Sequence, residues 1–471
     1  CIGLINLLFQ IKNITTPYFF TVIIGSGYWM MSAVIAYQLY KIVWQDNRKR
    51  LHNTIALFFM IHTAVVFINL FRIMAETGSV NPNTYMGMDV KYYMSTGDFI
   101  TGISLDAPVT TAVISAFGVL YFLYKQRFML SVVCMAALII SASNFTNLLL
   151  VSIFVFVFAF YSNRMQKSFI LIHLLMLVVF MAKVSARNYE HVGRLFYQVI
   201  NKPYDLPRVK LPTLDELKKM PDSVLNDEER KKKFARIYID SMNTIRLGID
   251  YKEPANVLIQ KAVPAMVNEF KESPVVVEHI NRYAGFITHT YSMEEQDKLA
   301  VQYNWKAPGK LIAGKQLIHF FMANPGRIAF GNGVANFSSR LAFKATLLDI
   351  GGRYPGKLKY IHPDFFSNHL YTYLYFHSQQ QSMHKASNTP ASIYYQVSGE
   401  YGIVGFLMLL LLYFGFFILR ITKHSFGLPL LLLLAGTFWG EYWFEQFSVV
   451  VLFELLFFID MKNMPREEQP V

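Results

Sequence analysis

One glutamate lies where a polar stretch of the chain gives way to an apolar one. Glu400 stands in ASIYYQVSGEYGIVGF, residues 391–406, at the start of a run that is apolar enough to form a membrane helix. A carboxylate in such a place can act as a general base or position a hydroxyl group for reaction. It can equally cap the helix start, where the helix dipole favours a negative charge by about 0.3–1 kcal/mol. The sequence leaves both roles open.

Other acidic side chains also lie in or beside apolar segments. Glu441 and Glu445 are four residues apart among aromatic residues, and they could line one cavity or simply lie in a short turn. Glu454 falls inside the last apolar segment, where an acidic group usually faces a partner or a wet cavity. Three aspartates near the end of the second apolar segment and the start of the third are further candidates: Asp89, Asp98 and Asp106.

Familiar signatures of nucleotide and metal chemistry are missing from the sequence. It has no Walker loop, dinucleotide fingerprint, zinc-protease helix, cysteine-rich metal site or nucleophile elbow. Its two cysteines, Cys1 and Cys134, rule out a disulfide framework. We therefore expect neither a metal nor another cofactor.

The composition is typical of a membrane protein that crosses the bilayer many times. The chain has 471 residues, of which 54% are hydrophobic and only 16% charged. The apolar residues gather in segments suited to crossing a bilayer. Those after Cys1 are expected to end a preceding span, and a lipidated cysteine is the alternative. Nine spans are predicted, approximately at residues 17–43, 51–74, 106–125, 128–142, 145–162, 168–185, 401–420, 427–440 and 445–460.

Clusters of lysine and arginine predict the orientation. They occur at residues 47–50, 125–127, 163–167 and 420–424, which are alternate ends of the predicted spans. Such clusters mark cytoplasmic turns, so residues 187–400 are expected to face outward. Within that stretch, KQLIHFFMANP predicts a helix that ends at Asn324-Pro325, and GRIAFGNGVANF predicts a glycine-rich turn.

The predicted fold is an all-α integral membrane protein, a polytopic helical bundle with a large, mainly helical outward loop domain. Its expected parts are an N-terminal transmembrane block (1–186), the outward domain (187–400) and a C-terminal transmembrane block with a short cytoplasmic tail (401–471). Of the net charge of +13, +8 lies in the outward stretch 187–400 (28 Lys and Arg against 20 Asp and Glu), which indicates an anionic partner such as lipid head groups, diphosphates or acidic glycans. A solvated surface is the alternative, and no nucleic acid partner is expected.

Three patches together resemble the bacterial O-antigen polymerase and O-antigen ligase superfamily. The first, residues 325–339, resembles a turn of its outward loop through Pro325, Gly331, Gly333 and Asn336. The second resembles the family's re-entry into the membrane through Tyr394, Gln396, Glu400, Gly402 and Gly405. The third, residues 141–158, resembles the start of the span that carries an outward-facing arginine. This chain has Asn144 in place of that arginine, and Ala391-Ser392 in place of the family's His-Asn pair.

The resemblance implies a metal-independent membrane glycosyltransferase in the bacterial inner membrane, with its large loop in the periplasm. Such an enzyme takes glycan from an undecaprenyl-diphosphate carrier. The acceptor is another lipid-linked glycan in a polymerase, and a lipid core or a protein in a ligase. Because the His-Asn pair is missing, the polymerase is favoured. Membrane lipids and other polysaccharide-assembly proteins are the expected partners.

Glycan transfer needs cations near the departing diphosphate, and arginine pairs well with phosphate through its planar fork. The candidates are Arg187, Arg194, Arg327 and Arg340, although ordinary ion pairs or contact with the membrane surface would also explain them. Tyr394 and Gln396 are expected to contact the glycan. His384 could replace the missing motif histidine as a catalytic group beside Glu400, or could be a solvated loop residue.

Two other classes of function compete with the enzyme. A non-catalytic assembly protein derived from the same fold would explain the missing motif residues. A transporter is less favoured, because it would carry more ionisable or broken segments at mid-membrane and would not need so large an outward domain.

Overall fold

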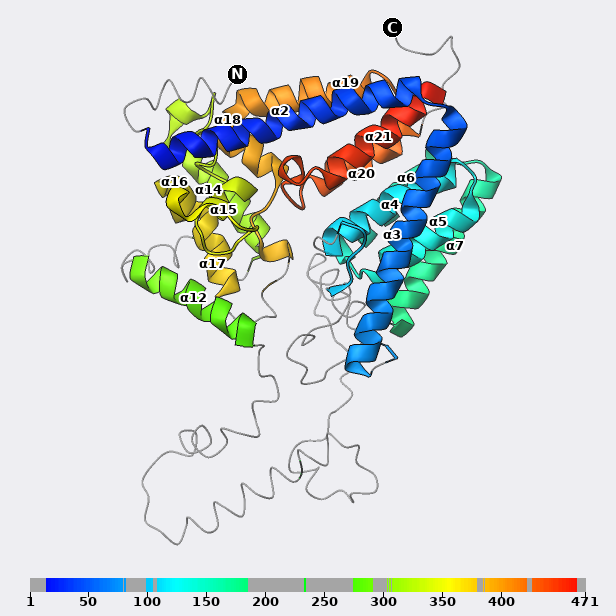
Figure 1. The fold of residues 1–471 in the computed structure, drawn as a ribbon, viewed down its shortest axis with the longest axis horizontal. Helices are drawn as coiled ribbons and strands as arrows, with labels where there is room; N and C mark the ends of the chain where they lie inside the picture. The colour runs from blue at the N-terminus through cyan, green and yellow to red at the C-terminus, as the bar shows by residue number, and fades with distance from the viewer. Residues whose placement is uncertain are drawn as a thin grey trace. The chain divides into compact units, whose positions relative to one another are not determined.

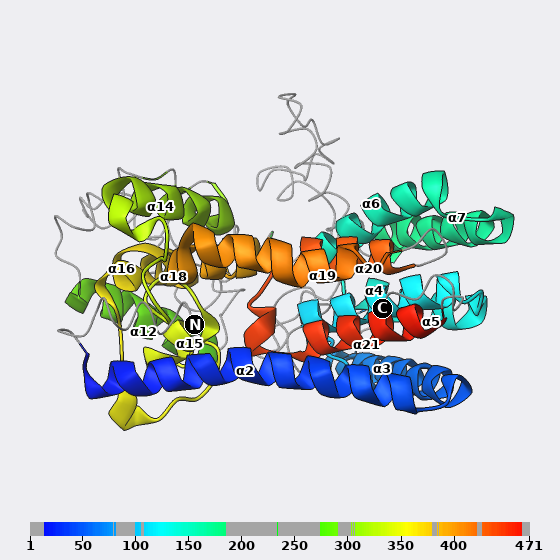
Figure 2. The same cartoon turned by 90° about the horizontal axis from the view of Figure 1, so that it is seen from above.

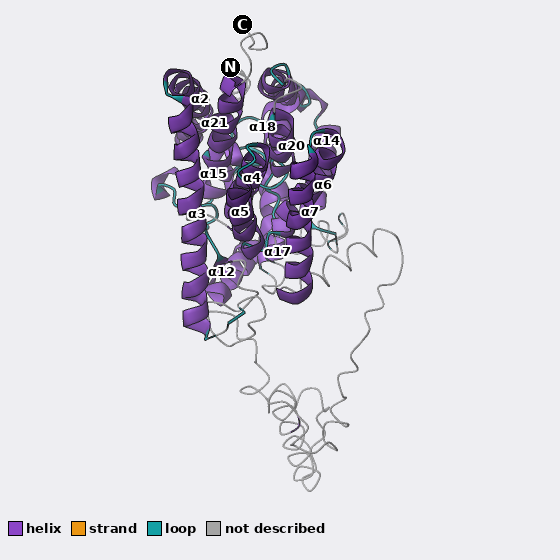
Figure 3. Ribbon diagram, turned by 90° about the vertical axis from the view of Figure 1, so that its right-hand side faces the viewer, coloured by secondary structure: helices purple, strands orange, loops and turns teal. Residues whose placement is uncertain are grey.

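The computed structural model describes residues 14–78, 80–81, 99–104, 108–184, 233, 274–290, 303, 305, 307–378, 384, 386–421 and 426–463. Within these ranges the regular structure is helical throughout, with no strand (Figure 3). This agrees with the all-α prediction. In this described part of the chain, four helices are long and apolar enough, by length and composition, to cross a membrane, namely Thr16–Gln45, Arg48–Thr77, Arg164–Val184 and Ala386–Ile418. Nine spans remain a prediction.

The first two helices form a hairpin with well-defined ends. Helix α2 (Thr16–Gln45) begins after Thr15, whose side chain accepts a bond from the Tyr18 N–H, and proline occupies its first turn. Helix α3 (Arg48–Thr77) begins after Asn47, which caps the Lys49 N–H, and ends at Gly78 in the left-handed conformation. The predicted basic cluster at residues 47–50 thus lies at the junction of the two helices, as the N-cap and first residues of α3.

Four further helices follow with tight turns between them. They are α4 (Pro108–Tyr124), α5 (Phe128–Ile140), α6 (Asn144–Phe160) and α7 (Arg164–Val179), which continues as the π-helical turn Phe180–Val184. Every residue of α4 from Thr110 to Leu123 is buried. An unbroken apolar sequence suits this position, because α4 packs against α5, α6, α20 and α21 and has no face that needs water.

The C-terminal helices complete this bundle. They are α18 (Ile393–Met408), continued by the π-helical turn Leu409–Phe414 and α19 (Gly415–Ile418), then α20 (Gly427–Thr437) and α21 (Ser448–Asn463). Helix α21 lies beside α2 in both views (Figures 1 and 2). Lys462 near the end of α21 donates to the Val43 and Asp46 carbonyls at the end of α2, so a cation satisfies the carbonyls of that helix terminus.

The described part of the predicted outward domain consists of short elements. They are α12 (Pro274–Thr290), α14 (Gly309–Ala323), η5 (Pro325–Arg327), α15 (Arg340–Ala345), η6 (Gly356–Leu358), α16 (Pro363–Phe365), η7 (Phe366–Leu370), α17 (Tyr371–His377) and η9 (Ala386–Asn388). Helix α14 ends before Asn324-Pro325, as predicted, and a turn with little helix follows.

The chain divides into two units, and every helix named above belongs to the first, which contains residues 1–86, 94–184 and 272–471. Within the first unit, part of the predicted outward domain packs on the apolar helices. Gly25 of α2, for example, lies directly against Val334 and Leu341. The predicted division at residues 187 and 401 stays a prediction.

Candidate functional site

The glycine-rich turn docks onto α18 through its backbone. Helix α18 breaks at Gly402, whose φ of 68° and ψ of −166° interrupt the helical hydrogen bonds. The turn supplies the missing partners. Four bonds of 2.8–3.1 Å join the two segments, from Asn332 N–H to Gly399 O, Gly333 N–H to Glu400 O, Ile403 N–H to Ile328 O and Val404 N–H to Ala329 O. Two patches that the sequence analysis singled out therefore form one structural unit.

Two glycines make this close approach possible. Gly331 has a φ of 73°, and a Cβ atom there would lie 2.5 Å from the backbone of Glu400 and Gly402. A Cβ atom on Gly402 would lie 2.4 Å from the carbonyl oxygen of Ala329. Any side chain would push the turn off the helix, and both positive φ values also disfavour other residues. The motif glycines at these two positions are thus explained by packing.

The break at Gly402 folds α18 back on itself. The Ile393 N–H donates to the carbonyl of Phe438, and the ring of Phe414 lies 5.5 Å from the ring of the same Phe438. In a straight helix Ile393 and Phe414 would be about 31 Å apart. The two arms before and after Gly402 must therefore diverge from the break, as the α18 ribbon in Figure 1 shows. The predicted span at 401–420 corresponds to the second arm.

Glu400 lies inside this unit, at the end of the first arm. Its side chain is only 1% exposed, and it accepts hydrogen bonds from the Ser339 hydroxyl and from the backbone N–H groups of Ala335 and Ser338. Ala335 has a φ of 58°, in the left-handed region. The carboxylate thus organises the second half of the glycine-rich turn. Its predicted catalytic role remains a prediction.

A second buried carboxylate lies close to the first. Glu445, in the turn Trp443–Glu445 (η11), accepts from the backbone N–H of Leu341 at 2.7 Å and from the Gln396 amide at 2.5 Å. Glu400 and Glu445 are near enough to repel each other when both are charged. Gln396, a predicted glycan contact, is fully buried and bonds this carboxylate.

Next to the glycine-rich turn lies a partly exposed set of polar residues, here called the turn cluster: Arg327, Asn332, Tyr360, His362 and Asp364. The Asn332 amide donates to Asp364 Oδ2 at 2.9 Å. Side-chain exposure is 38% for Asp364 and 21% for His362, whose Nδ1 lies 3.5 Å from the carboxylate. Arg327 is close enough to act on His362 electrostatically. Among the predicted site residues, Arg327 is the one that belongs to this cluster.

The protonation state of His362 follows from its neighbours. Burial lowers its pKa, and the nearby Arg327 lowers it further, while Asp364 acts in the opposite direction. Its Nδ1 accepts from the Asp364 backbone N–H at 3.2 Å and faces the Asn332 amide at 3.3 Å. These donors assign the proton of the neutral ring to Nε2. His362 is therefore a neutral hydrogen-bond donor.

Tyrosines connect the turn cluster to α2. The Tyr360 hydroxyl donates to Asn336 Oδ1 at 2.7 Å, and the Asn336 amide donates to the Tyr18 hydroxyl at 3.2 Å. The rings of Tyr18 and Tyr360 stack at 5.1 Å. Burial raises the pKa of Tyr360, so it stays a donor. Motif residue Asn336 thus holds the turn against the first long helix.

Other predicted site residues lie elsewhere in the fold or have internal partners. Arg340 starts α15 and donates to the Gly351 carbonyl at 3.1 Å. Tyr394 donates to the Ala435 carbonyl at 2.6 Å. His384 stacks on His377 at the end of α17, with ring centroids 4.9 Å apart. Five candidates lie outside the described residues: Arg187, Arg194, Asp89, Asp98 and Asp106.

The remaining motif positions have structural explanations. Pro325 begins the short helix η5, and Gly405 faces the Cβ atom of Tyr401. Ser392, in the place of the family's asparagine, caps α18 by accepting from the Tyr394 N–H at 3.2 Å. Asn144 begins α6.

Sequence reasoning missed a buried lysine beside the site. Lys310 in the first turn of α14 donates to the carbonyls of Ala391 and Gly440, the second at 2.9 Å. Burial lowers its pKa to about 8, and the opposite charge of Glu441 limits the fall. Lys310 thus joins α14 to the start of α18 and to the turn before α21.

His369 lies in a buried chain of hydrogen bonds. The Ser338 hydroxyl lies 2.5 Å from its Nδ1, and its Nε2 donates to the Ala313 carbonyl at 3.1 Å. Burial lowers the pKa of His369 to about 4, so the ring is neutral. The Tyr442 hydroxyl lies 2.8 Å from Ser338 and extends the chain. With both nitrogens bonded, His369 holds helices together.

His362 and Asp364 had a signal in the sequence that could have been used. They stand two residues apart in YIHPDFF, residues 360–366, a polar pair within an otherwise aromatic and apolar run. Because the pair is far from the glycine-rich turn in the sequence, the contact between the pair and the turn could not be predicted. Among the residues that the structure describes, no group of three or more His, Cys, Asp or Glu side chains could hold a metal ion.

Comparisons with protein-family models, with curated proteins and with solved structures found no match to this chain.

Proposed function

We propose that this protein transfers glycan from an undecaprenyl-diphosphate carrier at the outer face of the bacterial inner membrane, as a polysaccharide polymerase. The observation that carries the proposal is the docking of the glycine-rich turn on α18 at Gly402. Two patches that resemble the O-antigen polymerase and ligase superfamily separately are joined there by four backbone bonds, next to a partly exposed cluster of polar residues.

The turn cluster has the groups that such a reaction requires. Arg327 would neutralise charge that develops on the departing diphosphate, and the Nε2–H of His362 would donate to one of its oxygens. Asp364 would accept the proton of the acceptor hydroxyl. The bond from the acceptor oxygen to the anomeric carbon forms while the bond from that carbon to the diphosphate oxygen breaks. The diphosphate leaves with the electron pair. Glu400 would act indirectly, by holding the turn in shape.

A second candidate function is a non-catalytic assembly protein derived from the same fold. This function is favoured because three motif residues, Glu400, Gln396 and Tyr394, form hydrogen bonds with other groups of the protein. In that case the turn–helix unit would serve stability alone.

The test is complementation of a strain that lacks the protein, followed by gel analysis of surface and lipid-linked glycans. We expect Arg327→Gln and Asp364→Asn to leave single-repeat glycan where the wild-type protein restores long chains. Matched controls are Arg353→Gln and Asp349→Asn, which remove the same groups outside the turn cluster and should restore long chains.

Each outcome separates the candidates. Long chains that stay on the carrier and are absent from their acceptor would replace the polymerase with a ligase. Normal glycans from both turn-cluster variants, at wild-type protein levels, would refute the site and favour the assembly protein.

A further inference from the structure

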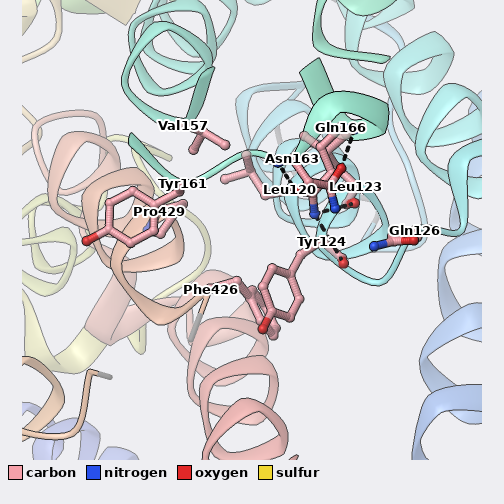
Figure 4. Close-up of a pocket in the computed structure, with 10 residues that line it drawn as sticks. All are labelled: Leu120, Leu123, Tyr124, Gln126, Val157, Tyr161, Asn163, Gln166, Phe426 and Pro429. Carbon is pink, nitrogen blue, oxygen red and sulfur yellow. Dashed lines mark hydrogen bonds between the residues drawn. The ribbon is translucent and has the colours of Figure 1, made fainter. Parts of the chain in front are cut away.

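A cavity of about 380 Å³ lies at the end of the helices where the basic turns are (Figure 4). This volume is within the range of small-ligand sites. The cavity, here called the basic-end cavity, is formed by the last turns of α4 and α6, the start of α7 and the start of α20. It is lined by Leu120, Leu123, Tyr124, Gln126, Val157, Tyr161, Asn163, Gln166, Phe426 and Pro429.

The lining is amphipathic. The aliphatic side chains of Leu120, Val157 and Pro429 line it together with the amides of Gln126 and Asn163, which belong to the two interhelical turns. Figure 4 shows Tyr161 and Gln126 on opposite sides of the space. Such a lining suits a molecule with both an apolar chain and a polar group.

Four basic residues are sequence neighbours of the lining. Lys125, Arg127, Arg164 and Lys167 each directly adjoin a lining residue in the chain. The ammonium group of Lys125 lies 5.2 Å from the ring centre of Tyr124 and 5.5 Å from that of Phe426. Both rings line the cavity, so cation–π contacts hold this charge beside it. Asp460, a buried carboxylate, is close enough to act on Lys125 electrostatically.

The surrounding surface is apolar. On α6, Phe160 is 74% exposed, and on α20, Leu432 is 37% exposed. Both helices are shorter apolar helices of the bundle. Exposed apolar side chains of this kind favour lipid contact. A ligand would therefore reach the cavity from a bilayer.

We propose that the basic-end cavity binds an anionic phospholipid, with its phosphate beside Lys125 and the start of an acyl chain along Leu120, Val157 and Pro429. Basic pockets between membrane helices recognise anionic head groups through the same combination of charge and apolar wall. This site is distinct from the turn cluster and does not depend on the proposed glycan transfer.

The experiment is native mass spectrometry of the full chain in detergent, with phosphatidylglycerol and phosphatidylcholine that carry identical acyl chains. We expect retention of phosphatidylglycerol to exceed that of phosphatidylcholine by about fivefold or more, since one surface cation contributes about 1 kcal/mol. Lys125→Gln should reduce the phosphatidylglycerol signal about fivefold. Lys41→Gln on α2, the matched control, removes the same charge from an exposed position outside the lining and should change it less than twofold.

A cavity-filling variant tests the apolar part. Val157→Phe should reduce retention of phosphatidylglycerol without any change of charge, provided that size-exclusion chromatography shows a folded protein. If this variant does not fold, competition by free glycerol phosphate replaces it, and we expect no displacement of the lipid. Equal retention of the two lipids, equal effects of Lys125→Gln and Lys41→Gln, or displacement by glycerol phosphate would each overturn the proposal.

Discussion

Gly331→Ala is the sharpest test of the docking between the glycine-rich turn and α18. The substitution has two costs. A side chain at a φ of 73° costs about 1–2 kcal/mol. The new Cβ atom would also lie 2.5 Å from the backbone of Glu400 and Gly402, so the turn must move away. That movement breaks at least the two nearest bonds, to Gly399 and Glu400, at about 1 kcal/mol each.

The expected loss in the free energy of unfolding is therefore about 3–4 kcal/mol. Gly78→Ala is a matched control, because Gly78 has a φ of 65° but its Cβ would meet no atom within 4 Å. It should lose only the conformational part, about 1–2 kcal/mol. The assay is unfolding of the full chain in detergent, titrated with SDS and followed by circular dichroism.

A double variant adds an independent check. Gly331→Ala and Gly402→Ala disturb the same contact, so their combined loss should be smaller than the sum of the separate losses. Equal losses for Gly331→Ala and Gly78→Ala would refute the docking. Strict additivity of Gly331→Ala and Gly402→Ala would also count against it.

Three further predictions use the same unfolding assay. Glu400→Ala should lower the free energy of unfolding by about 3 kcal/mol, because it leaves the buried N–H groups of Ala335 and Ser338 without an acceptor. Glu400→Gln should lower the free energy of unfolding by less. For Lys310, the pKa of about 8 in the folded state is below the ordinary value of 10.5, so between these two pH values the unfolded state binds more protons than the folded state. The free energy of unfolding should therefore rise with pH across that window, by on the order of 3 kcal/mol. Lys310→Met should abolish the rise, and an unchanged pH dependence would contradict the assignment. Asn163→Ala removes the capping box at the start of α7 and should cost about 1 kcal/mol, with Ser168→Ala on the exposed face of the same helix as the neutral control.

Local patterns in the sequence predicted the local structure well. The Asn324-Pro325 pair marked the end of α14, and the glycines after it predicted a turn, because both effects depend on the backbone preferences of a few adjacent residues. Apolar runs predicted α2 and α3 within a few residues for the same reason. Their length was enough to identify helices able to cross a membrane.

Tertiary structure decided what the motif residues do. From the sequence, Glu400 could be either a reactive group or a helix cap. In the folded protein it lies against the N–H groups of a turn that is more than sixty residues earlier in the chain. His362 and Asp364 gained their place beside Arg327 in the same way. Periodicity and turn preference act over a few residues, whereas the partner of a buried carboxylate depends on which distant segments can pack together. For this protein the sequence alone determined the helices and the turn, and only the tertiary structure decided that the turn fills the break at Gly402.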